Sequence, residues 1–296
     1  MIVAVTPNPA IDVTYRVGAH VPGETNRVLD VQRRPGGKGV NVARVLAALD
    51  VPVRAVLPLG GEAGRWLGSS LDIPFATVPI SAENRTTVTI SGDGHPTVYP
   101  EPGPEVSTEE WTAFGSVLAD CVADAELLVV SGSLPRGAAP ELVAEWIGLA
   151  REAGVRTLVD ASGPALLAAA RAGAVVKPNR AELLAATSAA DEAAGATALL
   201  RLGAQLVVVS RGAEGIAAHT SSDGVFAVPA IPDVHGNPTG AGDAATAGLA
   251  AALAADRPLI EALRSAAALG AAAVLRPVAG EVDLPAYHRF LNGAPA

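Results

Sequence analysis

A repeated pattern of short apolar runs, each followed by a turn and then a helical stretch, constrains the fold most. After residue 120 these turns begin Ser131-Gly-Ser, Asp160-Ala-Ser-Gly, Lys177-Pro-Asn and Ser210-Arg-Gly. The runs lack polar alternation, as expected for strands that helices cover on both faces. Such alternation of strands and helices predicts a parallel sheet whose functional loops gather at the carboxyl ends of its strands. We therefore expect an α/β fold with helices on both faces of a mainly parallel sheet.

Two segments, residues 12–31 and 85–101, break this rhythm. Thr86–Pro100 contains polar–apolar alternation on either side of Ser91-Gly-Asp-Gly94, which is typical of two strands joined by a hairpin turn. One face of these strands should be wet and the other covered. We expect a single catalytic domain over residues 1–296, with the two segments forming a small β-sheet lid.

Composition excludes several classes of protein. Half of the 296 residues are hydrophobic, but no run approaches the roughly 20 residues that span a bilayer. A net charge of −9 argues against nucleic-acid binding, and the single Cys121 excludes an internal disulfide. The start, Met1-Ile-Val-Ala-Val, has no basic region typical of a signal peptide. We expect a soluble, cytoplasmic protein with neither a nucleic-acid nor a membrane partner.

The stretch Asn237-Pro-Thr-Gly-Ala-Gly-Asp243 precedes an Ala-rich helix and carries the clearest chemical signal. Gly240 and Gly242 permit backbone conformations that side chains forbid, and the first amides of a helix favour anions. Asp243 beside such a pocket suggests phosphoryl transfer in which it accepts the proton of a hydroxyl group. The alternative for an isolated aspartate is an acid that stabilises a helix N-terminus.

The same residues match G-x-G-x-x-A, a nicotinamide-binding spacing. That interpretation needs a preceding strand, a following strand and an acid about 20 residues on. Here Pro229, Pro232 and Pro238 interrupt the approach, and a second helix follows the first. A dehydrogenase is therefore a poor interpretation.

A second glycine-rich turn, Arg34-Pro-Gly-Gly-Lys-Gly-Val-Asn41, opens another helix. Asn41 lies near the helix start, where it could face a ligand. The turn is not a Walker A motif, because Gly39 rather than Ser or Thr follows Lys38. An ordinary tight turn is an equally good interpretation of this motif alone.

Polar side chains also follow the apolar run at Val175-Val176. Asn179 and Glu182 lie three positions apart at a helix start, so both can face one loop end. Glu182 could hold Mg²⁺ through water, or it could form a capping box with Asn179. Three arginines at expected loop or lid positions, Arg27, Arg85 and Arg136, suit bidentate phosphate binding, whereas a solvated surface charge is the alternative for each.

Together these motifs resemble the phosphofructokinase-B family of ribokinase-like sugar kinases, and most closely its 1-phosphofructokinase and tagatose-6-phosphate kinase branch. The resemblance begins at Thr6-Pro-Asn-Pro-Ala-Ile-Asp12 and extends almost to the C-terminus. It includes Gly36–Leu46, Ser131–Gly137, Asp160–Gly163, Lys177–Asn179, Val209–Gly215 and Gly240–Asp243. It implies a ribokinase-like three-layer α/β/α sandwich and a lid that pairs with another lid in a homodimer.

The resemblance also implies roles for individual residues. Asp243 would be the catalytic base, and the amides of Gly240, Ala241 and Gly242 the anion hole. Sugar hydroxyls would meet Asp12, Gly37 and Asn41, and the phosphate already on the sugar would meet Arg27, Lys38, Arg85 and Arg136. ATP phosphates and Mg²⁺ would lie near Lys177, Asn179 and Glu182, with Ser210, Gly212 and Gly215 lining the nucleotide side.

The pattern departs from the family at Pro238, Ala161 and Arg211, where Thr, Ser or Thr, and an apolar residue are frequent. We expect ATP-dependent phosphorylation of a ketohexose phosphate, with fructose 1-phosphate the first choice. A cluster of four cations would be costly around an unphosphorylated sugar. The alternatives are tagatose 6-phosphate or fructose 6-phosphate as acceptor, or a non-catalytic sensor that keeps the fold.

Overall fold

The computed structural model describes residues 1–92 and 96–293, so part of the expected hairpin turn at 91–94 lies outside the described residues. The strands are β1 (Ile2–Val5), β2 (Ala10–Val17), β3 (Val28–Gly36), β4 (Val53–Gly60), β5 (Phe75–Ile80), β6 (Arg85–Ser91), β7 (Thr97–Pro100), β8 (Leu127–Ser131), β9 (Arg156–Asp160), β10 (Val175–Val176), β11 (Leu206–Ser210), β12 (Ile216–His219) and β13 (Val225–Val228). The helices are α1 (Lys38–Ala48), α2 (Gly61–Ser70), α3 (Thr108–Val122), α4 (Glu141–Glu152), α5 (Gly163–Arg171), α6 (Arg180–Thr187), α7 (Glu192–Leu202), α8 (Ala241–Ala254), α9 (Leu259–Val274) and α10 (Leu284–Leu291), with a 3-10 turn η1 at Gly212–Glu214.

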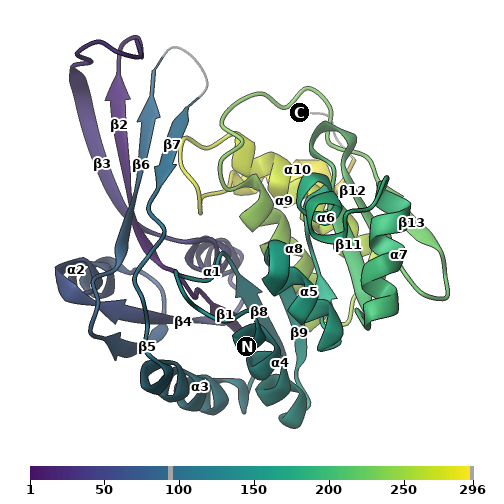
Figure 1. Cartoon of the computed structure of the whole chain (residues 1–296). Helices are drawn as coiled ribbons and strands as arrows, with labels where there is room; N and C mark the ends of the chain where they lie inside the picture. The colour runs from purple at the N-terminus through teal and green to yellow at the C-terminus, as the bar shows by residue number, and fades with distance from the viewer. Residues whose placement is uncertain (93–95, 294–296) are drawn as a thin grey trace.

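The large sheet has the strand order β13-β12-β11-β10-β9-β8-β1-β4-β5 (Figure 1). Pairing is parallel from β11 to β5, and the hairpin of β12 and β13 is antiparallel. The strand residues of β1 and β8 are all buried, as the absence of polar alternation predicts. The prediction of a mainly parallel sheet is therefore confirmed.

Alternate residues of the strands pack into two separate apolar layers. Ile2 and Ala4 of β1 face a core formed with α1, α8, α9 and α10. Val3 and Val5 face the opposite core, formed with α3 to α7. Trp111, Phe114 and Trp146 fill this second core, with ring centroids 5.2 to 5.6 Å apart. The side-chain period of two along a strand thus gives the three-layer arrangement.

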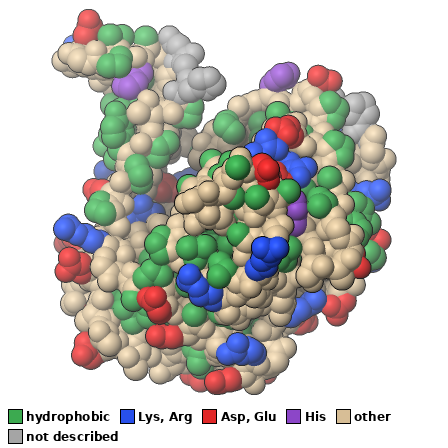
Figure 2. Space-filling view, turned by 45° about the vertical axis from the view of Figure 1, so that its right-hand side comes forward, with side chains coloured by type: hydrophobic (Ala, Val, Ile, Leu, Met, Phe, Trp, Pro, Cys, Tyr) green, Lys and Arg blue, Asp and Glu red, His purple; other side chains and the backbone are tan. Residues whose placement is uncertain are grey.

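A second, four-stranded sheet with the order β3-β2-β6-β7 rises from the body, as Figures 1 and 2 show. β2 pairs parallel with β6, and the two outer strands pair antiparallel. The expected small sheet is present, with wider bounds than predicted: β2 begins at Ala10, and β3 continues to Gly36. The glycine-rich turn before α1 is therefore mostly the end of a strand. Within the described part of the chain, no helix combines the length and hydrophobicity that a bilayer crossing requires.

Candidate functional site

The loop before α8 presents the start of a helix to a cleft. Gly240 takes a left-handed conformation with φ 84°, and a Cβ there would lie 2.7 Å from Ala279. Glycine is therefore required at this position on two grounds. The Ala241 amide donates to the carbonyl of Pro238 at 3.1 Å. Among the described residues, no hydrogen bond from the amides of Gly240 or Gly242 is found, so these two, and not Ala241, are available to an anion.

Asp243 lies in the first turn of α8 and is 6% exposed. Asn41 of α1 donates to its Oδ2 at 2.8 Å. Burial and the nearby charge of Asp160 together raise the pKa of Asp243 to about 7, against the hydrogen bond from Asn41. This differs from an ordinary helix-start acid, which is exposed and has a low pKa. The side chain has the environment expected of a general base.

Asp160, at the end of β9, connects the polar groups beneath this loop. It is 2% exposed and accepts from Lys177 at 3.0 Å, from Lys38 at 3.2 Å and from Thr246 at 2.7 Å. Burial would raise its pKa, but the charges of the two lysines and the hydroxyl of Thr246 lower it to about 2. Asp160 is therefore a permanent anion that fixes both lysines of the chain.

The two lysines occupy different positions around Asp160. The Lys177 side chain is 3% exposed and its ammonium faces Asp160, so it is placed behind the cleft rather than at its surface. Lys38 is 43% exposed and lies 3.9 Å from Glu182. The charge of Asp160 raises the pKa of Lys38, as do Asp243 and Glu182, while burial opposes them. Lys38 is thus a positively charged group that lies between the carboxylates of Asp160 and Asp243 and that of Glu182.

A cavity of about 260 Å³ extends from Lys38 and Glu182 to Arg85. Its lining includes Thr6, Asn8 and Ser131, each with a buried side-chain oxygen that has no hydrogen-bond partner among the described residues. Buried polar atoms are nearly always paired in folded proteins. Two cations beside two unpaired hydroxyl groups, those of Thr6 and Ser131, therefore indicate a site for a polar, negatively charged ligand, while the Asn8 carbonyl oxygen can accept from a donor on the same ligand.

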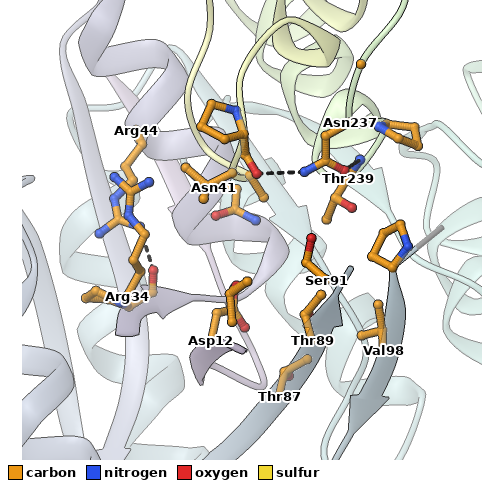
Figure 3. Close-up of a pocket in the computed structure, with 18 residues that line it drawn as sticks. Asp12, Arg34, Asn41, Arg44, Thr87, Thr89, Ser91, Val98, Asn237 and Thr239 are labelled. Carbon is orange, nitrogen blue, oxygen red and sulfur yellow. Dashed lines mark hydrogen bonds between the residues drawn. The ribbon is translucent and has the colours of Figure 1, made fainter. Parts of the chain in front are cut away.

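A larger cleft of about 420 Å³ separates the small sheet from the body. Figure 3 shows Asp12 and a row of hydroxyl groups on β6 facing the loop at Asn237. Asp12 packs against Gly36, where a Cβ would lie 2.0 Å from its Oδ2. Burial raises the pKa of Asp12 to about 6, although the charges of Arg85 and Arg44 lower it. The structure thus brings Asp12 and Asn41 to one cleft.

Several predicted site residues lie elsewhere. Arg27 is exposed in the loop between β2 and β3, and Arg136 is 72% exposed and 3.9 Å from Glu105. Neither lines either of these two cavities. Arg85 does line the smaller one, although its guanidinium also donates to backbone carbonyls of Asn8 and Glu101. Gly37 adopts φ 110° at the N-cap of α1, where its backbone turns the chain from β3 into the helix.

At the residues expected to meet the nucleotide, the capping box that the sequence analysis named as an alternative is present. Asn179 accepts from the Glu182 amide, and Glu182 Oε2 accepts from the Asn179 amide, both at 2.8 Å. Its other oxygen, Oε1, lies 3.9 Å from Lys38 in the smaller cavity. Glu182 can therefore cap α6 and still offer an oxygen to a ligand. No cluster of three or more metal-binding side chains occurs in the described residues.

Gly212 begins the turn η1 and Gly215 follows it, while Ser210, at the end of β11, forms an isolated parallel bridge with Asn179. Gly215, with φ 93°, could not carry a Cβ, which would lie 2.1 Å from the carbonyl oxygen of Val228. Arg211, one of the three departures from the family pattern, pairs with Glu192. The turn is thus held by charge as well as by backbone pairing.

Comparison with known proteins decides the family. The family model described as "pfkB family carbohydrate kinase" matches residues 3–286. The chain belongs to the pfkB family of carbohydrate kinases. It is therefore a phosphotransferase that uses an alcohol group as acceptor.

Solved structures similar to this pfkB chain agree. Phosphofructokinase-2 from Escherichia coli in complex with potassium is 29% identical, with a TM-score of 0.92 over 99% of this chain and 98% of that one. A possible 1-phosphofructokinase from Thermotoga maritima is 26% identical, with a TM-score of 0.87 over 99% and 97%. Ribokinase from Arabidopsis thaliana, complexed with ribose and ATP, is 22% identical, with a TM-score of 0.77 over 98% of both chains. The last confirms the ribokinase-like fold.

Several residues of the pfkB site were missed from the sequence. The sequence indicates Asp160 only as part of the motif Asp160–Gly163, because its partners Lys38 and Thr246 are 122 and 86 positions away. The hydroxyl row on β6 could have been found from the alternation of that strand, whose polar face had no assigned role. Thr87, Thr89 and Ser91 form this row.

Proposed function

We propose that this carbohydrate kinase transfers the γ-phosphoryl group of ATP to a ketohexose phosphate, with fructose 1-phosphate the preferred acceptor. The observation that carries the proposal is the placement of Asp243. It is a buried carboxylate with a raised pKa, held by Asn41 beside two free amides at a helix start. This combination supports proton abstraction next to a site for transferred phosphate.

In this mechanism the acceptor hydroxyl lies against Asp243, which takes its proton as the new O–P bond forms and the bond to the leaving ADP breaks. The amides of Gly240 and Gly242 stabilise negative charge on the transferred group. Asp12 accepts hydrogen bonds from sugar hydroxyls, and Asn41 donates hydrogen bonds to them. Because phosphoryl transfer has a largely dissociative transition state, positioning contributes more than base strength.

The smaller cavity supports a phosphorylated acceptor. Lys38 and Arg85 supply positive charge there, and Thr6, Asn8 and Ser131 supply unpaired oxygens. A plain sugar could bond to the oxygens but would leave the two positive charges without an anionic partner. Arg27 and Arg136 contribute only if their loops move toward the cavity, because both are exposed here.

We place the ATP phosphates and Mg²⁺ at the Glu182 side of the same cavity. Mg²⁺ is commonly held by one or two carboxylates and substrate phosphates, and it neutralises their developing charge. The Oε1 of Glu182, which the capping box leaves free, suits this role through water. Asn179, Ser210, Gly212 and Gly215 border the nucleotide side, whereas Lys177 acts from behind through Asp160.

We also propose that the small sheet is a lid that pairs with the lid of a second copy. Its outer face exposes Leu29, Val31 and Tyr99, with exposed fractions of 60%, 48% and 54%. Apolar patches of this kind mark interaction surfaces. Phosphofructokinase-2 from Escherichia coli has a tetrameric inhibited form, which makes oligomers plausible for a relative. Light scattering should give a dimer that Val31→Asp weakens and that Val225→Asp, on the exposed edge strand β13, leaves intact.

An acceptor panel tests the function. Coupled ADP release is measured with fructose 1-phosphate, fructose 6-phosphate, tagatose 6-phosphate, ribose and adenosine. Fructose 1-phosphate should give the highest kcat/KM. Faster turnover of ribose or adenosine than of any hexose phosphate would contradict the proposal, and ligand binding without turnover would favour a sensor.

A further inference from the structure

One short segment between α9 and α10, Arg276–Glu281, contacts three parts of the active cleft. Pro277, Val278 and Ala279 line the larger cleft together with residues of the small sheet. The proposed function assigns no role to any of its residues. Its contacts nevertheless reach the lid, α1 and the loop before α8.

The contact with the lid is an ion pair. Arg34, near the end of β3, donates to Glu281 Oε1 at 2.7 Å. Arg276 lies 3.5 Å from the other oxygen of the same carboxylate. The side chains of Arg34 and Glu281 are 35% and 31% exposed, so water screens the pair only in part. Glu281 thus holds one strand of the small sheet against the body of the protein.

Arg34 stands directly opposite Asp12 in the register of β2 and β3. Both residues line the larger cleft, so they occupy one face of the small sheet. Anything that fixes Arg34 therefore fixes the part of the lid that carries Asp12, the expected ligand of a sugar hydroxyl.

The same segment also touches the catalytic loop. Asn237 donates to the carbonyl of Pro277 at 2.8 Å, and Ala279 packs so closely on Gly240 that no side chain would fit there. At Gly280 a Cβ would lie 3.0 Å from Asn41 Oδ1, and Asn41 holds Asp243. One segment therefore links the lid to both the anion loop and the partner of the base.

We propose that Glu281 is a positioning residue that sets the acceptor side of the cleft by fixing the lid strand through Arg34. This inference rests on the proposed kinase function and adds a residue to it. Glu281 touches neither reactant. It acts by keeping Asp12 at a fixed distance from Asn41 and from the loop at Gly240, so that the acceptor meets a preformed site.

Glu281→Gln removes the charge and keeps the shape. Since partly exposed ion pairs are worth little individually, the KM for the acceptor should rise by about two- to fivefold, with the KM for ATP unchanged. A loosened lid also admits water, so the ratio of ATP consumed to sugar phosphorylated should increase. Glu62→Gln is the matched control, because Glu62 forms an exposed pair with Arg65 on α2.

A double-mutant cycle identifies the partner. If Glu281 acts through Arg34, the combination of Arg34→Gln and Glu281→Gln should raise the acceptor KM no further than Arg34→Gln alone. Fully additive effects would overturn the inference, as would an unchanged acceptor KM or an equal rise in the ATP KM in Glu281→Gln. A folding defect alone would lower kcat without changing either KM or the ratio.

The wild-type chain separates the two proposals. If it phosphorylates no hexose phosphate, the proposed function fails, whatever Glu281 does. If it is active and Glu281→Gln matches Glu62→Gln in acceptor KM, only the role of Glu281 fails.

Discussion

Two charged clusters of the main body, one around Asp160 at the end of β9 and one around Glu192 at the start of α7, differ in whether they leave a charge without a partner. Glu192 accepts from Arg180, Arg211 and His219, and Arg180 also forks onto Glu214. Burial would raise the pKa of Glu192, but hydrogen bonds from these partners lower it to about 2.

The cluster around Asp160, in contrast, includes a carboxylate whose charge is not balanced. Asp160 itself is satisfied, but beside it Asp243 has a pKa raised to about 7 by burial and by the charge of Asp160. Thr6, Asn8 and Ser131, which line the cavity nearby, each have a buried side-chain oxygen without a hydrogen-bond partner among the described residues. A network that only stabilises a fold pairs its charges, whereas a site for chemistry leaves charge and hydrogen-bonding capacity for its ligands.

Asp243→Asn should have the largest effect, because it removes the proton acceptor but keeps an oxygen that can accept the hydrogen bond from Asn41. We expect kcat to fall by about 10²–10⁴-fold with ligand binding largely intact. Steady-state kinetics and ATP titration measure the two parts. Asp233→Asn, an exposed aspartate in the preceding loop, is the control and should retain full turnover. Near-normal turnover of Asp243→Asn would contradict the assignment of chemistry to the cluster around Asp160.

Asp160→Asn tests the buried anion. It leaves Lys38 and Lys177 without their carboxylate, and removing one partner of a buried pair costs about 3–5 kcal/mol of folding stability. Loss of its charge also lowers the pKa of Asp243, so the midpoint of the pH–rate profile should move below 7. Chemical denaturation and pH profiles measure these effects.

Thr246→Val is the matched control for Asp160→Asn. It removes the hydrogen bond to Asp160 but keeps all three charges. The midpoint of its pH profile should stay near that of the wild type. An equal shift in both variants would mean that packing, and not the charge of Asp160, sets the pKa of Asp243.

The pH dependence of the wild type is the third test. Asp243 accepts a proton only when ionised, and its pKa of about 7 lies above that of Asp12, about 6. Activity is therefore present above pH 7 and lost as the pH falls. The value of kcat/KM for the acceptor should drop about tenfold per pH unit below 7 and more steeply below 6, where Asp12 also takes up a proton.

Asp12→Asn should remove the steeper limb and leave the first one. A profile that is flat from pH 5 to 8 would contradict both assignments. A single limb in the wild type would contradict the role of Asp12 alone. Initial rates at saturating ATP and limiting acceptor measure the profile.

The sequence predicts much of the fold because the burial of a strand can be inferred from the local pattern of apolar residues. Continuous apolar runs before Ser131 and Ser210 indicate helix-covered strands, and the structure has them. The bounds of the small sheet were less accurate, since β3 continues through Arg34 to Gly36, residues whose glycine and proline neighbours suggest a turn. Pairing with β2 overrides that local preference.

The candidate site is predictable only where a motif lies within one loop. Gly240, Gly242 and Asp243 adjoin one another, so their proximity needs no tertiary information. The partnership of Asp160 with Lys38, or of Glu281 with Arg34, spans 122 and 247 positions and depends on how strands are ordered in the sheet. The sequence also could not reveal that the amide of Ala241 turns back onto Pro238.

Glu192→Gln should have the smallest effect and completes the comparison. It weakens the attachment of the 210–215 turn, which we place beside the nucleotide, so the KM for ATP should rise by up to about fivefold while kcat and the acceptor KM stay near wild type. Glu214→Gln, on a 65% exposed side chain of the same network, should change the ATP KM less. If instead Glu192→Gln lowered kcat as far as Asp160→Asn, charge balance would not distinguish the two clusters, and the turn would have to contact the transferred phosphoryl group.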